Sequence, residues 1–149
     1  MSLKNKVPPP IIAAVFLALI YLTRSVANVQ FPFQGYIAAV FLLAAISVMI
    51  LGVREFRRLQ TTVNPLKPDT ATTLATNGVF KVSRNPMYLG LLGILIAGSV
   101  FFGASTAVVL VPLFVIYMNV FQISSEEEAM AKLFENDFKE YRSKVRRWI

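Results

Sequence analysis

Residues 85–125 read NPMYLGLLGILIAGSVFFGASTAVVLVPLFVIYMNVFQISS and contain no charged side chain. A helix that crosses the ~30 Å hydrocarbon core of a bilayer needs about 20 mostly apolar residues. The run is therefore too long for one crossing and too short for three. Gly103, Ala104 and Ser105 near its middle predict the turn of a membrane hairpin. Pro112 is expected to bend the second helix of this hairpin without ending it.

The composition of the whole chain agrees with a membrane protein. Hydrophobic residues make up 56% and charged residues 15% of the 149 residues, whereas soluble domains average about 45–50% and about 25%. We therefore predict an all-α polytopic fold with one domain, residues 1–149, in which residues 7–53 form two scaffold spans and residues 86–123 form the hairpin. The four uncharged segments that carry this prediction are Pro9–Leu22, Gly35–Val53, Pro86–Phe102 and Thr106–Ile123.

The basic residues predict how the spans are oriented. Of the 15 Lys and Arg residues, all except Arg24 precede the first span, separate the second from the third, or follow the fourth. Because basic loops stay on the cytoplasmic side, we expect both termini in the cytoplasm, with the bacterial inner membrane as the location. The net charge of +7 also favours anionic membrane lipids as partners, and nucleic acid is not an expected partner.

The first two spans carry no recognisable chemical motif. The first span follows Lys4 and Lys6 and precedes the small residues Ser25–Ala27. This order of basic, apolar and small residues is also typical of a signal peptide, but the adjacent Arg24 disfavours cleavage there. The second span has small residues that would suit contact with a second copy of the chain, so a homo-oligomer is one alternative. These residues are Gly35, Ala38, Ala39, Ala44 and Ala45.

The absence of Cys and His limits the chemistry of the chain. Neither residue type occurs in the sequence. This excludes disulfides, thiol nucleophiles, imidazole acid–base catalysis and zinc sites built from these ligands. No metal site is predicted, and any reaction must use Tyr, Asn, Arg, Lys and carboxylate side chains.

Two regions lie outside the predicted spans. Residues 54–85 contain Asn64-Pro65 and Asn77-Gly78 but no long apolar period, which predicts an ordered cytoplasmic loop with turns. Residues 125–149 repeat apolar residues at steps of three or four, which predicts an amphipathic tail helix on the cytoplasmic face. The repeating residues are Met130, Leu133, Phe134, Phe138, Tyr141, Val145 and Trp148.

Polar residues flank the hairpin at both cytoplasmic ends. Arg84 and Asn85 precede its first helix, whose N-terminus would attract a carboxylate. Glu126, Glu127 and Glu128 follow its second helix and would attract an ammonium group. This arrangement predicts a site for a small zwitterion.

Each of these motifs also has a purely structural interpretation. Asn85 could be the N-cap of a helix that starts at Pro86, and Tyr88 could be an aromatic residue at the membrane interface. Ser125 and Glu128 could form a capping box at the start of the tail helix.

The motifs resemble those of the membrane-embedded methyltransferase superfamily, which contains isoprenylcysteine carboxyl methyltransferases and phospholipid N-methyltransferases. The family pattern is Leu-x-x-x-Gly-x-Tyr, then Arg-His-Pro-x-Tyr-x-Gly, a hydrophobic hairpin, Glu-Glu with Phe-Gly following, and a tail of Tyr-x-x-Tyr-x-x-x-Val-x-Arg. Here it occurs as LATNGVF at residues 74–80, RNPMYLG at 84–90, the acidic pair, Phe134, and a tail from residue 138 to residue 147. The resemblance covers residues 61–149.

Three departures from that pattern bear on the chemistry. Asn85 replaces the family's His, which keeps a hydrogen-bond donor but removes a titrating imidazole. Phe80 and Phe138 each lack a phenol hydroxyl that relatives carry, and Glu135 replaces the Gly after Phe.

The resemblance implies S-adenosylmethionine as cofactor, bound at the cytoplasmic face. Methyl transfer from a sulfonium needs positioning more than acid–base help, so no side chain is assigned as catalytic. By position in the motifs, Leu74, Ala75 and Phe80 would line the nucleoside pocket, Asn85, Pro86, Met87 and Tyr88 would hold the methionine part, and Glu126, beside Glu127, would pair with its ammonium group.

The sequence does not identify the methyl acceptor. Some relatives carry a substrate-contacting Arg four residues before the Glu matched to Glu126, whereas this chain has Gln122 there, so Gln122 and Arg147 are the expected acceptor contacts. The acceptor would be a lipophilic or small nucleophile, such as a prenylcysteine-like carboxylate, a lipid amine or a thiol, that enters between the third and fourth spans. The alternative is a non-enzymatic small membrane scaffold or accessory subunit.

Overall fold

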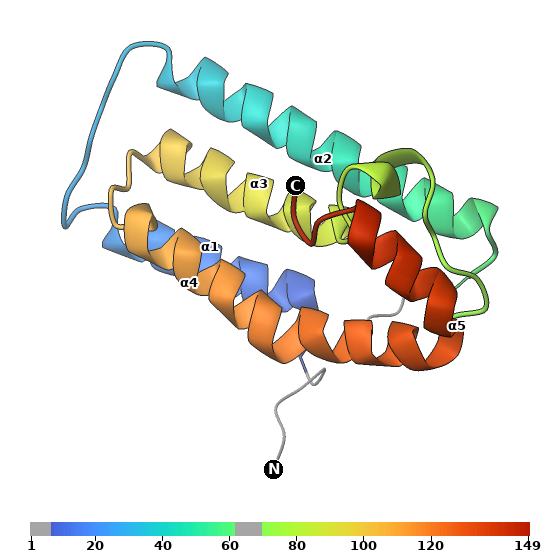
Figure 1. The fold of residues 1–149 in the computed structure, drawn as a ribbon. Coiled ribbons are helices and arrows are strands. Elements are labelled where there is room, and N and C mark those ends of the chain that lie inside the picture. The colour runs from blue at the N-terminus through green and yellow to red at the C-terminus, as the bar shows by residue number, and fades with distance from the viewer. Residues whose placement is uncertain (1–6, 62–69) are drawn as a thin grey trace.

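The computed structural model describes residues 7–61 and 70–149, in which every regular element is a helix. Helices α1 to α4 lie side by side, and α5 folds back at one end of this bundle (Figure 1). The prediction of an all-helical chain is therefore confirmed. The elements are α1 (Pro9–Thr23), α2 (Gln34–Arg58), the 3₁₀-helix η2 (Gly78–Lys81), α3 (Pro86–Phe102), α4 (Ala107–Tyr117), the π-helical η3 (Met118–Ile123) and α5 (Ser124–Lys144).

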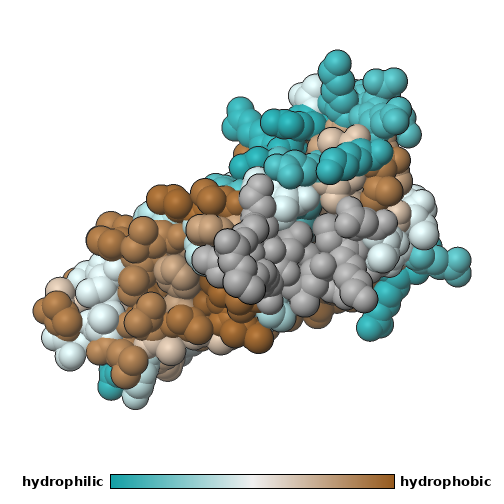
Figure 2. Space-filling model, turned by 90° about the horizontal axis from the view of Figure 1, so that it is seen from below, coloured by the Kyte–Doolittle hydropathy of each residue, from teal (hydrophilic) through white to brown (hydrophobic). Residues whose placement is uncertain are grey.

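Two helices are long and apolar enough to cross a membrane by length and composition. These are α2 and the continuous helix from Ala107 to Lys144, whereas α1 and α3 are apolar but shorter. In Figure 2, hydrophobic residues cover much of the elongated part of the face shown, and hydrophilic ones gather mainly at the opposite end. These features indicate a membrane protein, and the crossing of the membrane by all four segments stays a prediction.

The predicted hairpin is present with its predicted turn. Helix α3 ends at Phe102, and Gly103 adopts a left-handed conformation with φ 62°. A Cβ atom at this position would lie 2.5 Å from the carbonyl oxygen of Val29, so both the backbone angle and the close approach require glycine. Helix α4 then continues through Pro112, as expected.

Small residues let α2 and α3 pack closely. Ala38 and Ala45 of α2 are buried. Cβ atoms added at Gly90 and Gly93 of α3 would lie 2.9 Å from the Ala45 carbonyl oxygen and 2.8 Å from the Ala45 Cβ. Ala38 and Ala45 are therefore part of the packing within the chain and are not available for contact with a second copy. Contact through the exposed residues Gly35, Ala39 and Ala44 stays a prediction.

Two hydrophobic clusters organise the rest of the chain. The larger joins α1, α3 and α4 through buried residues such as Ile20, Leu95 and Phe114. The smaller joins the segment before α3 to α5 and consists of the buried residues Ala75, Phe80, Phe138 and Tyr141. The Tyr141 hydroxyl donates a hydrogen bond of 2.7 Å to the Phe80 carbonyl oxygen. This second cluster fixes α5 against the region that holds the predicted site.

The loop predicted over residues 54–85 is shorter than expected. Helix α2 continues to Arg58, and its last turn contains Arg57 and Arg58, whose positive charges suit a helix C-terminus. The turn at Asn77-Gly78 is present, with φ 59° at Gly78, whereas Asn64-Pro65 lies outside the described residues.

The tail helix predicted over residues 125–149 is present as α5, but its course and its end differ from the prediction. Helix α5 continues directly from η3, so no helix begins at Ser125, and the Ser125 hydroxyl donates to the Gln122 carbonyl oxygen at 3.1 Å instead of capping. The capping-box interpretation is therefore incorrect. The chain reverses at Glu135 (φ 38°, ψ −107°), and the helix ends at Lys144.

We expect Glu135→Gly to stabilise the protein by about 1 kcal/mol, because Gly adopts a positive φ without the steric cost that Glu meets there. Denaturation of the detergent-solubilised protein measures this change. Glu128→Gly is the matched control, since Glu128 lies in the regular part of the same helix and should lose about 1 kcal/mol. Equal losses in both variants would show that the reversal at Glu135 is not strained.

Candidate functional site

The first part of the site is a hydrogen-bonded group of three side chains at one end of the bundle. The Tyr88 hydroxyl, in the first turn of α3, donates to Oε1 of Glu126, and the Gln122 amide donates to the same oxygen at 2.7 Å. Gln122 is only 3% exposed and lies in the π-helical segment η3, a geometry that often occurs at functional sites. In the described part of the chain, no side chain or backbone group donates to Oε2 of Glu126.

This environment changes the acidity of Glu126, which follows the apolar part of its helix. Removal from water raises the pKa of Glu126 to about 7, although the hydrogen bonds from Tyr88 and Gln122 favour the ionised form. Within the described residues, Glu126 forms no ion pair. The Glu126 carboxyl group therefore has hydrogen-bond donors but no cationic side chain beside it in the described part of the chain.

The neighbouring Glu127 is in the opposite situation, because two arginines neutralise it. Arg147 donates to both carboxylate oxygens, with Nη2 to Oε2 at 2.6 Å and Nε to Oε1 at 3.1 Å, and Arg84 Nη2 donates to Oε1 at 2.8 Å. Burial alone would raise the pKa of Glu127, but the hydrogen bond from Arg147 and the charges of both arginines hold it below the ordinary value. Glu127 therefore has a structural ion pair.

Arg84 is the best buried member of this cluster. Its side chain is 9% exposed, and its Nη1 donates to the carbonyl oxygens of Val145 and Arg142. Its Nε is buried without a hydrogen-bond partner in the described part of the chain. An unsatisfied buried donor on a cation is costly, and an anionic ligand would remove that cost.

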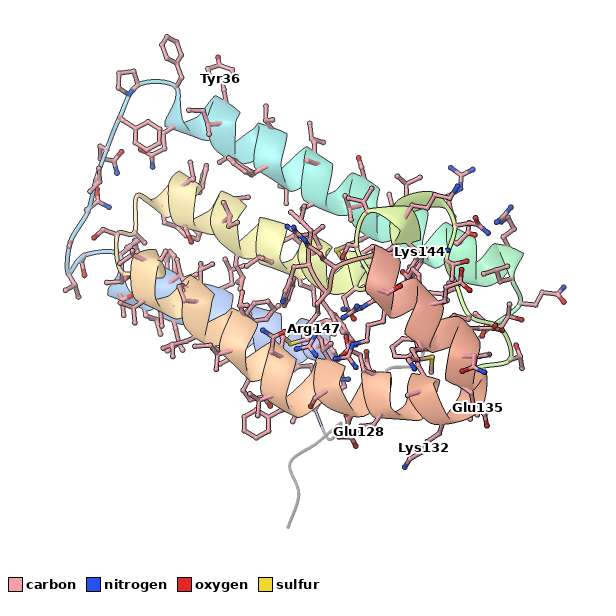
Figure 3. The ribbon with its side chains drawn as sticks, viewed as in Figure 1. Tyr36, Glu128, Lys132, Glu135, Lys144 and Arg147 are labelled. Atoms are coloured by element: carbon pink, nitrogen blue, oxygen red, sulfur yellow. The ribbon has the colours of Figure 1, made fainter. Side chains whose placement is uncertain are left out.

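The last residues of the chain fold back over the motif that precedes α3. The Arg84 amide donates to the Arg146 carbonyl oxygen at 3.1 Å, and the Asn85 side-chain amide donates to the Arg147 carbonyl oxygen at 2.9 Å. Asn85 occupies the predicted N-cap position of α3, directly before Pro86, but its side chain makes no cap hydrogen bond. Figure 3 shows Arg147 between α3 and α4, whereas Glu128 and Lys132 point away from the bundle.

A small pocket of about 70 Å³ joins these groups. It is lined by six of the nine predicted cofactor residues and by Phe56 and Arg84. It is far below the 300–1,000 Å³ typical of a ligand site, so a whole nucleoside cofactor would fit only after side chains move. The six predicted residues are Phe80, Asn85, Pro86, Met87, Tyr88 and Glu126.

Two of the remaining predicted residues lie elsewhere. Leu74 lines a separate cleft of about 570 Å³ between the segment before α3 and the second half of α5. Ala75 is buried in the smaller hydrophobic cluster. The contact between Phe80, which lines the pocket, and Tyr141, which lines the cleft, connects the walls of these two cavities.

The sequence analysis missed Phe56 as a lining residue and did not count Arg84 among the ligand contacts. Phe56 lies in the last turns of α2 and stacks edge-on against Phe80, with ring centroids 5.1 Å apart. Its signal in the sequence is a single aromatic residue within the charged stretch REFRR at 54–58. An apolar ring that would otherwise face water in such a stretch indicates a buried contact.

Together, the fold and the site define a helical membrane protein with a small pocket at one end of its bundle, in which Arg84, Asn85 and Glu126 lie among apolar and aromatic side chains. A family model described as phospholipid methyltransferase matches residues 33–137, which is more than half of the chain. The chain belongs to the phospholipid methyltransferase family, whose members are membrane methyltransferases.

Sequence similarity to curated proteins is limited. An uncharacterized protein of Haemophilus influenzae is 41% identical over 63 residues, which make up 42% of this chain and all of that protein. No solved structure matches the chain. The family assignment therefore supports methyl transfer in general, and the comparisons name no acceptor for this chain.

Proposed function

We propose that the protein transfers a methyl group from S-adenosylmethionine to a lipophilic or small nucleophilic acceptor at the membrane surface. The observation that carries this proposal is the pocket in which the carboxylate of Glu126 faces the start of α3. A site with a carboxylate at one side and a helix N-terminus at the other suits the ammonium and carboxylate of an amino acid. S-adenosylmethionine has this amino-acid end, and its sulfonium supplies the methyl group.

The residues of the pocket fit that amino-acid end by charge. Oε2 of Glu126 would accept hydrogen bonds from the ammonium group, while Tyr88 and Gln122 hold Oε1 in place. The N-terminus of α3 and the unpartnered Nε of Arg84 would bind the carboxylate. Placement of the nucleoside end near Leu74, Ala75 and Phe80 has less support, because Ala75 is covered by other side chains.

The identity of the acceptor is constrained by where the two expected acceptor contacts lie. Gln122 is bound to Glu126, and Arg147 is bound to Glu127, so both are already engaged. A carboxylate acceptor such as a prenylcysteine would need a free cation, which neither provides. The family description of phospholipid methyltransferase favours a lipid amine, and a thiol is the remaining alternative.

Transfer of labelled methyl groups tests the proposal. The purified protein in nanodiscs made from bacterial lipids is incubated with methyl-labelled S-adenosylmethionine, the unreacted label is removed, and methylated products are then counted in the lipid and aqueous fractions. The proposal predicts label in the lipid fraction with wild type and with Glu128→Gln, whose side chain points away from the site. Label in neither fraction would favour the non-enzymatic membrane scaffold.

The proposed orientation has its own test. The chain contains no Cys, so single cysteines introduced at the exposed positions Ser143 and Gln30 report their side of the membrane without background. An impermeant thiol reagent applied to intact bacterial cells stripped of their outer membrane should label the Gln30→Cys protein and spare the Ser143→Cys protein. Labelling of both from outside would contradict the placement of the site and both termini in the cytoplasm.

A further inference from the structure

Two arginines and one glutamate form a charge cluster beside the small pocket. Arg147 donates to both oxygens of the Glu127 carboxylate, through Nη2 at 2.6 Å and through Nε at 3.1 Å. Arg84 donates to Oε1 of this carboxylate alone, at 2.8 Å. Among the described residues, no second carboxylate pairs with either arginine. Two cations therefore share one anion, and the cluster keeps one positive charge in excess.

The excess charge reaches the pocket through Arg84, which lines it, whereas Arg147 does not. The Arg84 side chain is 9% exposed and that of Arg147 is 31% exposed. The Nε of Arg84 is buried and has no hydrogen-bond partner in the part of the chain that the structure describes. Because a cation that is removed from water attracts an anion more strongly than an exposed one, Arg84 is the group that would bind an anionic part of a ligand.

The contact between Arg147 and Glu127 is well fixed. The carbonyl oxygen of Arg147 accepts a hydrogen bond of 2.9 Å from the Asn85 side chain, and the indole of the next residue, Trp148, donates to Asn119 at 3.1 Å. Held in this way, the planar guanidinium group meets both carboxylate oxygens, the strongest arrangement that an arginine forms with a carboxylate. Without Arg147, Arg84 would be the sole counter-charge of Glu127 and would attract a ligand carboxylate less.

We propose that Arg147 is a positioning residue for the cofactor site: by neutralising Glu127, it leaves the charge of Arg84 to the carboxylate of the ligand's amino-acid end. This inference rests on the proposed binding of S-adenosylmethionine. It takes the place of the expectation that Arg147 contacts the methyl acceptor, because Arg147 acts through its neighbours and does not touch the ligand. The last residues of the chain thereby set how strongly the pocket selects a carboxylate.

Two ligands that differ by one carboxylate test this role. S-adenosylhomocysteine and its decarboxylated analogue share the nucleoside, the sulfur and the ammonium group, so the ratio of their affinities measures what the carboxylate contributes. Calorimetric titration of the full chain in nanodiscs gives this ratio for each variant. Wild type should prefer S-adenosylhomocysteine, and Arg147→Gln should reduce this preference about tenfold, because the cluster loses its excess charge.

Further variants separate the charge of Arg147 from its part in folding. Arg146→Gln removes the same charge from the exposed neighbouring position and should keep the wild-type preference. Glu127→Gln leaves both arginine charges unopposed and should raise the preference above that of wild type. The double variant of Arg147→Gln and Glu127→Gln has one excess positive charge again, so its preference should return to near the wild-type value. A purely structural role of Arg147 predicts no such recovery.

The outcomes for this role and for the proposed function are distinct. A folded Arg147→Gln protein with the wild-type preference, or a Glu127→Gln protein whose preference does not rise, would overturn the role of Arg147 and leave the cofactor site in place. A double variant that stays as low as Arg147→Gln would also overturn it. Wild type that binds neither ligand at millimolar concentration would refute the cofactor site and this inference with it.

Discussion

Glu127→Gln is expected to lower the free energy of unfolding by about 3 kcal/mol, the range found when one partner of a buried ion pair is removed. The side chains of Glu127 and Arg84 are 12% and 9% exposed, and Arg147 pairs with the same carboxylate. A neutral amide would leave two arginines, one of them buried, without a counter-charge. Chemical denaturation in detergent measures the loss.

The pH dependence of this loss gives an independent check. The folded-state pKa of Glu127 lies below its ordinary value, so the ion pair contributes its stability at neutral pH and loses it as the pH falls below about 4. Wild type should therefore approach the Glu127→Gln variant in stability at low pH. Glu128→Gln should remain within about 0.5 kcal/mol of wild type, as exposed substitutions usually do. Equal stability of the Glu127 and Glu128 variants at neutral pH would contradict the ion-pair assignment.

The second large effect is expected on ligand affinity and not on folding. Glu126→Gln should weaken binding of S-adenosylhomocysteine about 10- to 100-fold, because a charged hydrogen bond contributes about 1.5–3 kcal/mol. Its stability should stay near that of wild type, since Gln keeps an oxygen that can accept from Tyr88 and Gln122. Calorimetric titration of both proteins measures the difference.

The pH dependence of binding distinguishes a direct contact between Glu126 and the ligand from an indirect effect of the substitution on affinity. Its pKa of about 7 means that the free carboxylate is largely protonated at pH 6 and largely ionised at pH 8. Affinity of wild type for an ammonium-bearing ligand should therefore rise over this interval, and the Glu126→Gln protein should show no such rise. An affinity in wild type that does not change between pH 6 and pH 8 would show that Glu126 does not bind the ligand.

The sequence was sufficient for the parts of the fold that follow from apolar length and turn chemistry. The segment predicted from Pro86 to Phe102 coincides with α3, because an uncharged run between Pro and Gly has well-defined limits. Six of the nine predicted cofactor residues meet at one pocket, because all of them except Phe80 lie at the two open ends of a single hairpin. Pairing of the hairpin helices brings these ends together whatever the rest of the chain does.

The different roles of Glu126 and Glu127 could not be deduced from the sequence. Adjacent residues on a helix point about 100° apart, so one faces Tyr88 and the other faces the arginines. The directions of Glu126 and Glu127 depend on the π-helical turn that precedes them. No pattern in residues 118–123 predicts that turn.

The course of the C-terminal tail could not be deduced from the sequence either. Its apolar residues recur at helical spacing, yet the chain reverses at Glu135 in a conformation that Glu rarely adopts. Long-range contacts outweigh this local preference, because Phe138 and Tyr141 are buried against Phe80 and Ala75 only after the reversal. The glycine that relatives carry at this position would have signalled the turn.

Titration of the purified protein with S-adenosylhomocysteine tests the central claim most directly. Heat of binding and the denaturation midpoint are followed together in nanodiscs, with the Glu126→Gln protein as control. A cofactor site predicts saturable heat and a stabilisation of about 2.7 kcal/mol when the ligand concentration is a hundred times the dissociation constant, both reduced in the control. Absence of heat and of stabilisation at millimolar ligand would contradict a cofactor site and leave the pocket a structural element of a membrane scaffold.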